Sequence, residues 1–286
     1  MATEYDFITC VKWSRDGRRI ALSGPLDPIV LWDVEKSCIA TTLADRYNGT
    51  LSIAWSPDDT QILSGQTEGK VRLWDLGTRR ATKLRGASGD VNAVAWQPRG
   101  DLVAAATLES GIVVWSANGS AVMERPGKDL LSVAVSWSPQ GDRLAACGVP
   151  SLSVWEGAQP DPTVEYIHSD PIYTVAWSRD GTLVAIAGDD ATVMVFQAGS
   201  SEPRQRLEGM SAGIVSVAFS ADGLGLAAVD RQGSVRIWNT RDWTSCPPIR
   251  VAAEFNALYN PLDFHPTEPR LVVATTQGVA VWHLDW

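Results

Sequence analysis

The sequence has few of the residues that build metal sites or nucleophilic active sites. It contains four cysteines and three histidines in 286 residues. Cys10, Cys38, Cys147 and Cys246 form no Cys-x-x-Cys pair, and no two histidines stand at the spacing of zinc or iron ligands. The pattern therefore predicts no metal and no cofactor, and thiols that stay idle in a reducing compartment.

Positive charge and long hydrophobic runs are also missing. The formal net charge is −9, which is the wrong sign for holding nucleic acid through its phosphates. No apolar run approaches the roughly 18 residues that a membrane-spanning helix needs. The first residues carry neither the basic nor the apolar part of a secretory signal. We expect a cytoplasmic protein whose partners include neither nucleic acid nor membrane.

Phenylalanine and tyrosine are scarce, with five of each, but there are 13 tryptophans and they recur at a regular interval. A first aromatic series repeats every 40 to 45 residues, at Trp13, Trp55, Trp96, Trp137, Trp177, Phe219 and Phe264. A second series repeats in the same way, at Trp32, Trp74, Trp115, Trp155, Phe196, Trp238 and Trp282. Only Trp243 and Trp286 stand outside the two series. A fixed period of this length indicates a repeat architecture.

Each unit of the repeat has the same internal plan. An alternating run such as 91–96 ends in the first aromatic, and a turn such as Ser178-Arg179-Asp180-Gly181 follows. A run of small apolar residues such as 102–106 comes next, and a second turn leads to another alternating run such as 70–74. This plan predicts three to four short strands in every unit and almost no helix.

Seven such units account for the whole chain and predict an all-β protein. We expect a seven-bladed β-propeller, in which radially arranged sheets bury a continuous core between neighbours. The small-residue runs are expected near the central axis. The first aromatic series is expected between blades, and the second one strand further out. The predicted single domain spans 1–286, with blades at about 8–43, 50–85, 91–126, 132–166, 172–208, 214–251 and 259–286.

The repeats resemble the WD-repeat β-propeller family over essentially the full chain. The resemblance rests on Leu31-Trp32-Asp33, on Leu73-Trp74-Asp75 and on the Ser-Arg-Asp-Gly turns. It implies a rigid scaffold that presents loops and the rim of a central channel to proteins or peptides. The Ala- and Arg-rich style is similar to prokaryotic members, which often sit beside kinase, ATPase or other signalling domains.

The sequence departs from the family in its polar chains. Many family blades carry a buried His–Ser/Thr–Asp–Trp hydrogen-bonded chain, and in this sequence only the fifth unit has the histidine. That unit supplies His168, Thr174 and Asp190, but Phe196 stands at the tryptophan position and has no N–H to donate. We therefore expect these degenerate blades to be held mainly by apolar packing and backbone ladders.

The remaining signals of chemistry are weak. Gly209-Met210-Ser211-Ala212-Gly213 matches the pattern of hydrolase nucleophile elbows, but that chemistry needs a following helix, and none is predicted. Asp189-Asp190 has the form of a solvated turn, and His265 that of a surface turn residue. We predict that the protein is not an enzyme and has no catalytic residues.

The pattern favours a scaffold or sensor module that binds a protein or peptide, as part of a larger signalling protein or alone. One alternative is a propeller enzyme with an active site at the channel mouth, which would need several inward histidines or carboxylates. Another is a glycan-binding propeller whose tryptophans stack on sugars. A protein captured from a lysate would favour the first interpretation, and a bound metal would favour the enzyme.

The resemblance also places the partner-binding surface, because family propellers line one channel mouth with residues that flank the start of each innermost strand. Most of these positions are apolar in this chain, and an apolar patch with a polar rim is typical of a binding site. The predicted partner-binding residues are Phe7, Leu51, Asp90, Asn92, Leu131, Val133, Tyr173, Asp189, Val215, Arg231 and Asn260.

The last blade is predicted to lack its outermost strand. In another repeat the outermost strand ends at Leu84, seven residues before the innermost strand begins at Val91. The same spacing counted back from Ile8 would end a closing strand at Met1. At the other end, the sequence stops soon after Trp282. The strand at 278–284 would then be an edge or be covered by residues 3–7. We expect a three-stranded last blade, a contact between that edge and another chain, or a longer protein that completes it.

Overall fold

Every secondary-structure element in the part of the chain that the structure describes is a β-strand. The computed structural model describes residues 8–43, 49–125, 131–149, 151–157, 159, 161–255, 259–276 and 278–284. The strands fall into seven sheets, and in each sheet consecutive strands pair antiparallel from the centre outward.

The first four sheets each contain four strands, which follow one another in the chain from the innermost to the outermost. They are β1 (Cys10–Trp13), β2 (Arg19–Ser23), β3 (Ile29–Asp33) and β4 (Cys38–Leu43); β5 (Thr50–Trp55), β6 (Gln61–Gln66), β7 (Val71–Asp75) and β8 (Arg80–Leu84); β9 (Val91–Trp96), β10 (Leu102–Thr107), β11 (Gly111–Ser116) and β12 (Ala121–Arg125); and β13 (Leu131–Trp137), β14 (Arg143–Val149), β15 (Ser151–Glu156) and β16 (Val164–Ile167).

The fifth and sixth sheets have four strands and the seventh has three within the described residues. They are β17 (Ile172–Trp177), β18 (Leu183–Gly188), β19 (Val193–Gln197) and β20 (Pro203–Leu207); β21 (Ile214–Phe219), β22 (Gly225–Asp230), β23 (Ser234–Asn239) and β24 (Ile249–Arg250); and β25 (Leu262–Phe264), β26 (Arg270–Thr275) and β27 (Gly278–His283).

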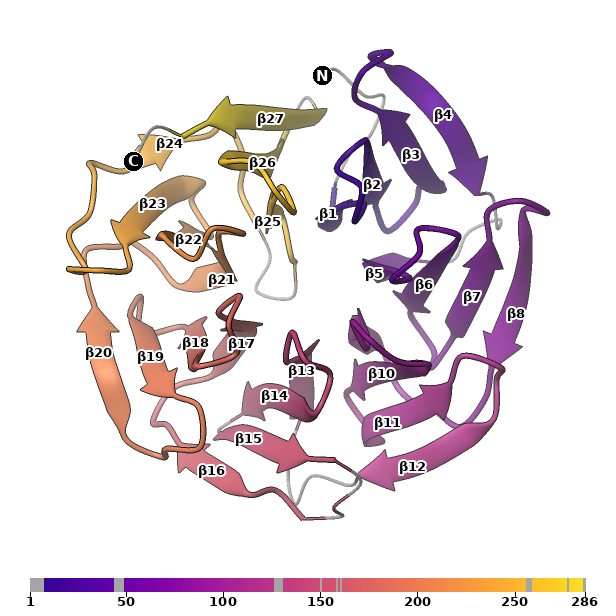
Figure 1. Ribbon diagram of the computed structural model, residues 1–286, viewed down its shortest axis with the longest axis horizontal. Coiled ribbons are helices and arrows are strands. Elements are labelled where there is room, and N and C mark those ends of the chain that lie inside the picture. Colours follow the sequence, from indigo (N-terminus) through magenta and orange to yellow (C-terminus); the bar gives the residue numbers. More distant parts are fainter. Residues whose placement is uncertain are drawn as a thin grey trace.

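The seven sheets stand radially around a centre, and the sheet of β25–β27 lies between the sixth sheet and the first (Figure 1). This arrangement confirms the predicted seven-bladed propeller. The hydrophobic core is divided among the spaces between neighbouring sheets. In one such cluster, Leu63 and Leu73 of the second sheet pack with Val103 and Trp115 of the third. The second strand of each sheet is covered on both sides by neighbouring sheets, and β10 is buried along nearly its whole length.

The first aromatic series is buried in the cores between neighbouring blades, as predicted, but the predicted offset of the second series is wrong. Trp13 on β1 pairs with Ile20 on β2, which pairs with Trp32 on β3, so the two series are two strands apart rather than one. The first series lines a central cavity of about 520 Å³. The small residues Ala104 and Ala105 lie one strand outward, on β10. The expectation that the small-residue runs lie nearest the axis is therefore wrong, since the innermost strands carry the first aromatic series.

The Ser-x-Asp turns after the innermost strands form a repeated hydrogen-bond pattern. Ser56 Oγ donates to Asp58 Oδ1 at 2.7 Å and accepts the backbone N–H of Gln61 at 2.9 Å. Ser178 donates to Asp180 in the same way at 2.6 Å. The hydrogen bond from serine lowers the pKa of Asp58 and of Asp180 below the usual range. These side chains hold the turn that the sequence pattern predicted.

The seventh sheet is joined to the first by polar contacts between the innermost strands. The N–H of Val11 donates to the carbonyl of Asn260 at 3.2 Å, and the N–H of Trp13 donates to Asp263 Oδ2 at 2.8 Å. Lys12 Nζ lies 3.5 Å from Asp263 Oδ1. Apolar residues of the sixth, seventh and first sheets also share one core cluster. The ring is therefore closed at its inner strands.

His265 belongs to this junction, and the prediction of a surface turn residue is wrong. Its side chain is only 4% exposed and packs edge-on against Trp13, with ring centroids 4.7 Å apart. Nδ1 accepts the N–H groups of Thr267 and Glu268, at 3.3 and 3.0 Å, so the proton resides on Nε2, which donates to the carbonyl of Gly17 at 3.2 Å. Burial lowers the pKa of His265.

We expect the free energy of unfolding to decrease as the pH falls below about 6.5, the ordinary pKa of histidine. The folded pKa of His265 is lowered, so below that pH the unfolded chain binds more protons and the contribution of the neutral ring is lost. Urea titrations at pH 7.5 and 5.5 measure the effect. His265→Gln, which cannot titrate, is the control, and an unchanged pH dependence in this variant would contradict the assignment.

No helix within the described residues is long and apolar enough to cross a membrane. Within the described residues the seventh sheet has three strands, and the predicted absence of a fourth stays a prediction. Residues 3–7, which were expected to cover that edge, lie outside the described residues. The predicted contact between this edge and another chain stays a prediction.

Candidate partner-binding site

The propeller has two faces, which the strand directions define. The upper face carries the start of every innermost strand and the turns between second and third strands, and the lower face carries the turns that follow the innermost strands. Ten of the eleven predicted partner-binding residues belong by position to the upper face, at or beside the starts of β5, β9, β13, β17, β21 and β25 or directly after β18 and β22. The eleventh, Phe7, lies outside the described residues.

Three of the predicted residues form one cluster on the upper face, which we call the Tyr–Asp–Arg cluster. Tyr173 Oη donates to Asp189 Oδ2 at 3.0 Å, and Arg231 Nη2 lies 2.8 Å from Asp189 Oδ1. The Arg231 guanidinium also lies over the Tyr173 ring, 5.1 Å from its centroid. Partial burial, followed by the hydrogen bond to Asp189, raises the pKa of Tyr173, so its hydroxyl stays protonated and donates.

The cluster joins two blades and remains open to solvent. Tyr173 is on β17 and Asp189 directly follows β18, whereas Arg231 directly follows β22 of the next sheet. The side chains of Arg231 and Asp189 are 37% and 38% exposed. A tyrosine and an arginine held in place by a shared carboxylate lose little freedom when a partner contacts them, and these residue types dominate binding energy at interfaces.

The apolar positions of the predicted surface divide into exposed and buried residues. Leu131 is 51% exposed and Leu51 is partly buried. Val133 and Val215 are 5% and 1% exposed, so they belong to the interior and cannot contact a partner. The prediction that Val133 and Val215 belong to the partner-binding surface is therefore wrong. Both residues stand where the innermost strand shifts register against its neighbour, between Ser132 and Ala134 in β13 and between Ile214 and Ser216 in β21.

Three polar residues of the predicted surface are used to join blades. Asp90 Oδ1 accepts the N–H of Glu68 at 3.1 Å, and the buried Asn92 donates from Nδ2 to the carbonyl of Ser132 at 3.2 Å. Ser216 Oγ donates to Asn260 Oδ1 at 2.7 Å. Asn92 is therefore an internal link, while Asp90 and Asn260 retain partial exposure.

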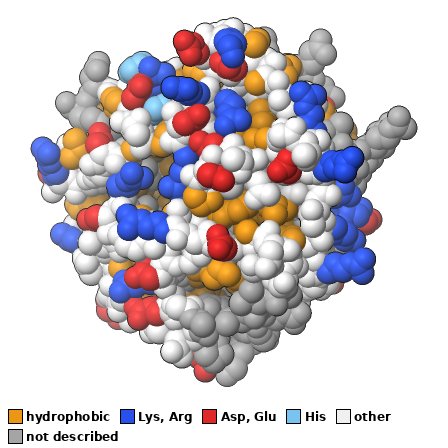
Figure 2. Space-filling model, turned by 45° about the vertical axis from the view of Figure 1, so that its right-hand side comes forward, with side chains coloured by type: hydrophobic (Ala, Val, Ile, Leu, Met, Phe, Trp, Pro, Cys, Tyr) orange, Lys and Arg blue, Asp and Glu red, His pale blue; other side chains and the backbone are white. Residues whose placement is uncertain are grey.

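Two exposed hydrophobic residues of the upper face were missed by the sequence analysis. Leu26, in the turn between β2 and β3, is 74% exposed, and Ile167, at the end of β16, is 77% exposed. Apart from Asp189 and Arg231, the prediction considered only the starts of innermost strands. The signal that could have found Leu26 is an apolar residue inside a turn that contains Pro25 and Pro28. Figure 2 looks onto the opposite, lower face, where hydrophobic side chains gather near the middle with acidic and basic side chains around them.

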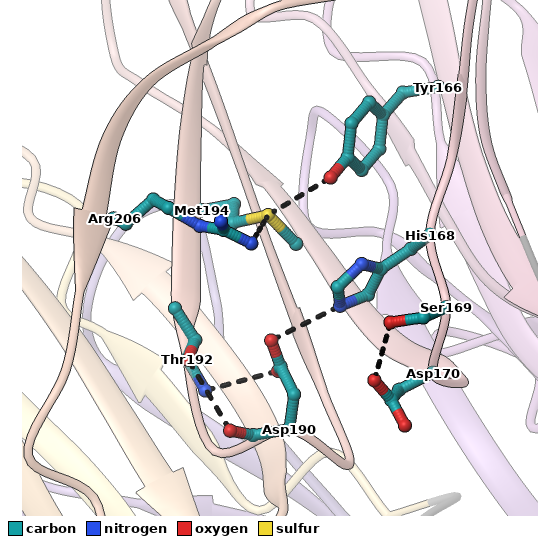
Figure 3. Close-up of polar contacts among 8 residues, drawn as sticks. All are labelled: Tyr166, His168, Ser169, Asp170, Asp190, Thr192, Met194 and Arg206. Carbon is teal, nitrogen blue, oxygen red and sulfur yellow. Dashed lines mark hydrogen bonds and ion pairs between the residues drawn. The ribbon is translucent and has the colours of Figure 1, made fainter.

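The polar chain of the fifth sheet is shorter than predicted. His168 Nε2 lies 3.1 Å from Asp190 Oδ2, and Asp190 Oδ1 accepts the N–H of Thr192 at 3.1 Å (Figure 3). Thr174 was expected to be part of this chain, but its hydroxyl instead accepts the N–H of Val217 on the next blade at 3.2 Å. His168 is 9% exposed, and this contact fixes the turn after β18 that also carries Asp189.

The serine of the nucleophile-elbow pattern has a structural role. Ser211 Oγ donates to Asp230 Oδ2 at 2.9 Å, and the fully buried Asp230 accepts the N–H groups of Gln232 and Ser234 at 3.0 and 2.8 Å. Strand β21 follows Ser211, whereas an elbow requires a helix. No group of three or more histidine, cysteine or acidic side chains that could hold a metal occurs among the residues that the structure describes.

Comparisons with known proteins match different parts of the ring. The model of eukaryotic translation initiation factor eIF2A matches residues 1–133, and the model of the WD domain, G-beta repeat, matches residues 162–197 and 201–239. WD repeat-containing protein 1 of Gallus gallus is 34% identical over 74 residues, which are 25% of this chain and 12% of that protein. WD repeat and HMG-box DNA-binding protein 1 of Xenopus laevis is 34% identical over 86 residues, 30% of this chain and 8% of that protein. The chain thus matches about a tenth of the length of these relatives.

Among solved structures, the β-propeller domain of Cps50 (Swd1) from Myceliophteria thermophila superposes with a TM-score of 0.86 at 20% identity, over 100% of this chain and 98% of that one. This likeness shows the fold of a seven-bladed propeller, and two of its units match the WD repeat model. The comparisons do not support the resemblance to prokaryotic members, since the relatives named above come from vertebrates and the eIF2A model is a eukaryotic one.

Proposed function

We propose that this propeller is a scaffold that holds a protein or peptide partner on its upper face. The observation that carries the proposal is the Tyr–Asp–Arg cluster, in which Asp189 holds Tyr173 and Arg231 in place while all three reach solvent. Leu131, Leu26 and Ile167 expose apolar surface on the same face. Aromatic and arginine anchors beside exposed apolar side chains are typical of protein interfaces.

A non-enzymatic role is part of the proposal. The polar groups that resemble catalytic motifs, Ser211 with Asp230 and His168 with Asp190, are each used in holding a turn. For location we propose the cytoplasm, which rests on the isolated cysteines of the sequence. Membership of a larger signalling protein, suggested by the family resemblance, belongs to the same proposal.

The test compares matched surface variants in partner capture. Leu131→Asp and Arg231→Glu change the upper face, and Ile39→Asp makes the same kind of change on the outermost strand β4, where Ile39 is 55% exposed. We expect a partner that the unaltered protein and Ile39→Asp both capture from lysate. Each upper-face variant should weaken its binding by about 2 kcal/mol or more, the size of an interface hot spot.

Two results would overturn the proposal. If every variant captures the partner equally, the partner does not bind the upper face. If no protein binds reproducibly, the scaffold interpretation itself is wrong. Thermal unfolding of each variant separates lost binding from lost folding, since surface changes of this kind should leave stability within about 0.5 kcal/mol.

A further inference from the structure

The lower face has a binding cavity of its own at the opposite end of the channel. The cavity, about 520 Å³ in volume, is lined by the ends of the innermost strands and by the turns that follow them. Five tryptophans of the first series form much of its wall, namely Trp13, Trp55, Trp96, Trp137 and Trp177. This volume is within the range of ligand pockets in proteins.

Positive charge is concentrated at this cavity. Its lining includes Lys12, Arg15, Arg99 and Arg179 but only one carboxylate, Asp263. The three arginines stand in the turns that follow β1, β9 and β17, which belong to alternate blades, so they surround the mouth of the cavity. This local excess of positive charge contrasts with the net charge of −9 for the whole chain, and such a focused patch attracts negatively charged groups.

The charge of the three arginines is only partly offset by the protein itself, because the carboxylate of Asp59 acts on Arg15. Asp263 pairs with Lys12. Among the described residues, none of the guanidiniums of Arg15, Arg99 and Arg179 forms an ion pair or a side-chain hydrogen bond. Partial desolvation, and then the neighbouring charge of Arg179, lower the pKa of Arg15. Cations gathered in this way repel one another, and an anion placed among them relieves that repulsion.

We propose that this cavity binds an acidic peptide segment of a protein partner, with carboxylates on the arginines of the three blades. Guanidinium groups pair well with carboxylates, and their positions on alternate blades suit successive side chains of an extended chain. A long nucleic acid would also have to lie along an otherwise acidic surface, which disfavours it.

This second site is on the opposite face from the partner surface proposed above and does not depend on it. The probe is a fluorescein-labelled octaglutamate peptide, with binding followed by anisotropy at low and at physiological salt. The test variant carries Arg15→Gln, Arg99→Gln and Arg179→Gln. Its matched control carries Arg80→Gln, Arg204→Gln and Arg241→Gln, which remove the same charge from exposed positions outside the cavity lining.

We expect the unaltered protein and the control to bind the peptide and the test variant to bind at least about tenfold more weakly, since a charged hydrogen bond contributes roughly that factor. Unlabelled peptide should change the tryptophan emission, because five indoles line the cavity. The single variant Arg99→Gln provides the same comparison if the triple variant fails to fold.

Three outcomes would overturn the proposal. Equal losses in the test and control variants would mean that attraction to the whole surface suffices. Binding of pyrophosphate but not of the peptide would assign the cavity to a compact anion, and preference for single-stranded oligonucleotide would assign it to nucleic acid. If Leu131→Asp and Arg231→Glu abolish capture of the upper-face partner but still bind the octaglutamate peptide, the two faces carry separate sites.

Discussion

Trp74→Ala should lower the free energy of unfolding by about 3–5 kcal/mol, the range for removing a large buried aromatic side chain. Trp74 is 4% exposed and packs between the first and second sheets with Leu31 and Ile53. Its Nε1–H donates to the buried hydroxyl of Ser64 at 2.9 Å. The substitution removes the ring from a space that rigid neighbouring sheets cannot close and leaves Ser64 without that donor. Urea titration measures the change.

Two variants separate the components of this loss. Trp74→Phe keeps most of the ring but not the N–H, so it should cost about 1–2 kcal/mol; Phe196 shows that a blade accepts this residue, at 1% exposure. Trp243→Ala should cost less than half as much as Trp74→Ala, because Trp243 is only partly buried at the edge of a core cluster. Equal losses for Trp74→Ala and Trp243→Ala would show that the periodic position carries no special packing role.

The blade number and the strand pattern could be predicted because the repeat encodes them locally. Each Ser-x-Asp turn closes through its own side chains, as in Ser56 and Asp58, so the signal is contained within one unit. The position of the aromatics relative to the axis could not be predicted in this way. It depends on how wide a channel seven inner strands leave, which is a property of the closed ring. The role of His265 was missed for the same reason, because Gly17, its partner, is at the other end of the sequence.

The candidate site was predicted in part. Counting positions along the repeat put Tyr173, Asp189 and Arg231 on one face, and the structure brings them into contact. The same counting could not distinguish Leu131, which is exposed, from Val133, which is buried, because the pairing of β13 with β14 shifts register between Ser132 and Ala134 and breaks the simple alternation there. The arginines that line the cavity of the lower face come from three different blades, so the sequence of a single repeat could not predict this cavity.

Gly188 connects the fold to the candidate site. It is the buried last residue of β18, directly before Asp189, and β17 and β18 shift register between Ile172 and Thr174. A Cβ at Gly188 would meet the backbone carbonyl of Pro171, far inside van der Waals contact. On the neighbouring fourth blade, a Cβ at Gly148 would meet the backbone carbonyl of Leu131 in the same way. A glycine at this position therefore lets the chain pass close to the end of the second strand as it enters the innermost strand.

Gly188→Ala should destabilise the protein by about 3 kcal/mol, the upper part of the range for overpacking, because backbone rather than a flexible side chain must yield. The shift of Pro171 should also separate Tyr173 from Asp189 and weaken capture of an upper-face partner in the folded fraction. Gly77→Ala is the control, since its added Cβ would meet only Asp75 Oδ1 at 3.6 Å, and it should stay within about 0.5 kcal/mol of the unaltered protein. If the two alanine variants unfold at the same urea concentration, close backbone approach at Gly188 is not what positions the Tyr–Asp–Arg cluster.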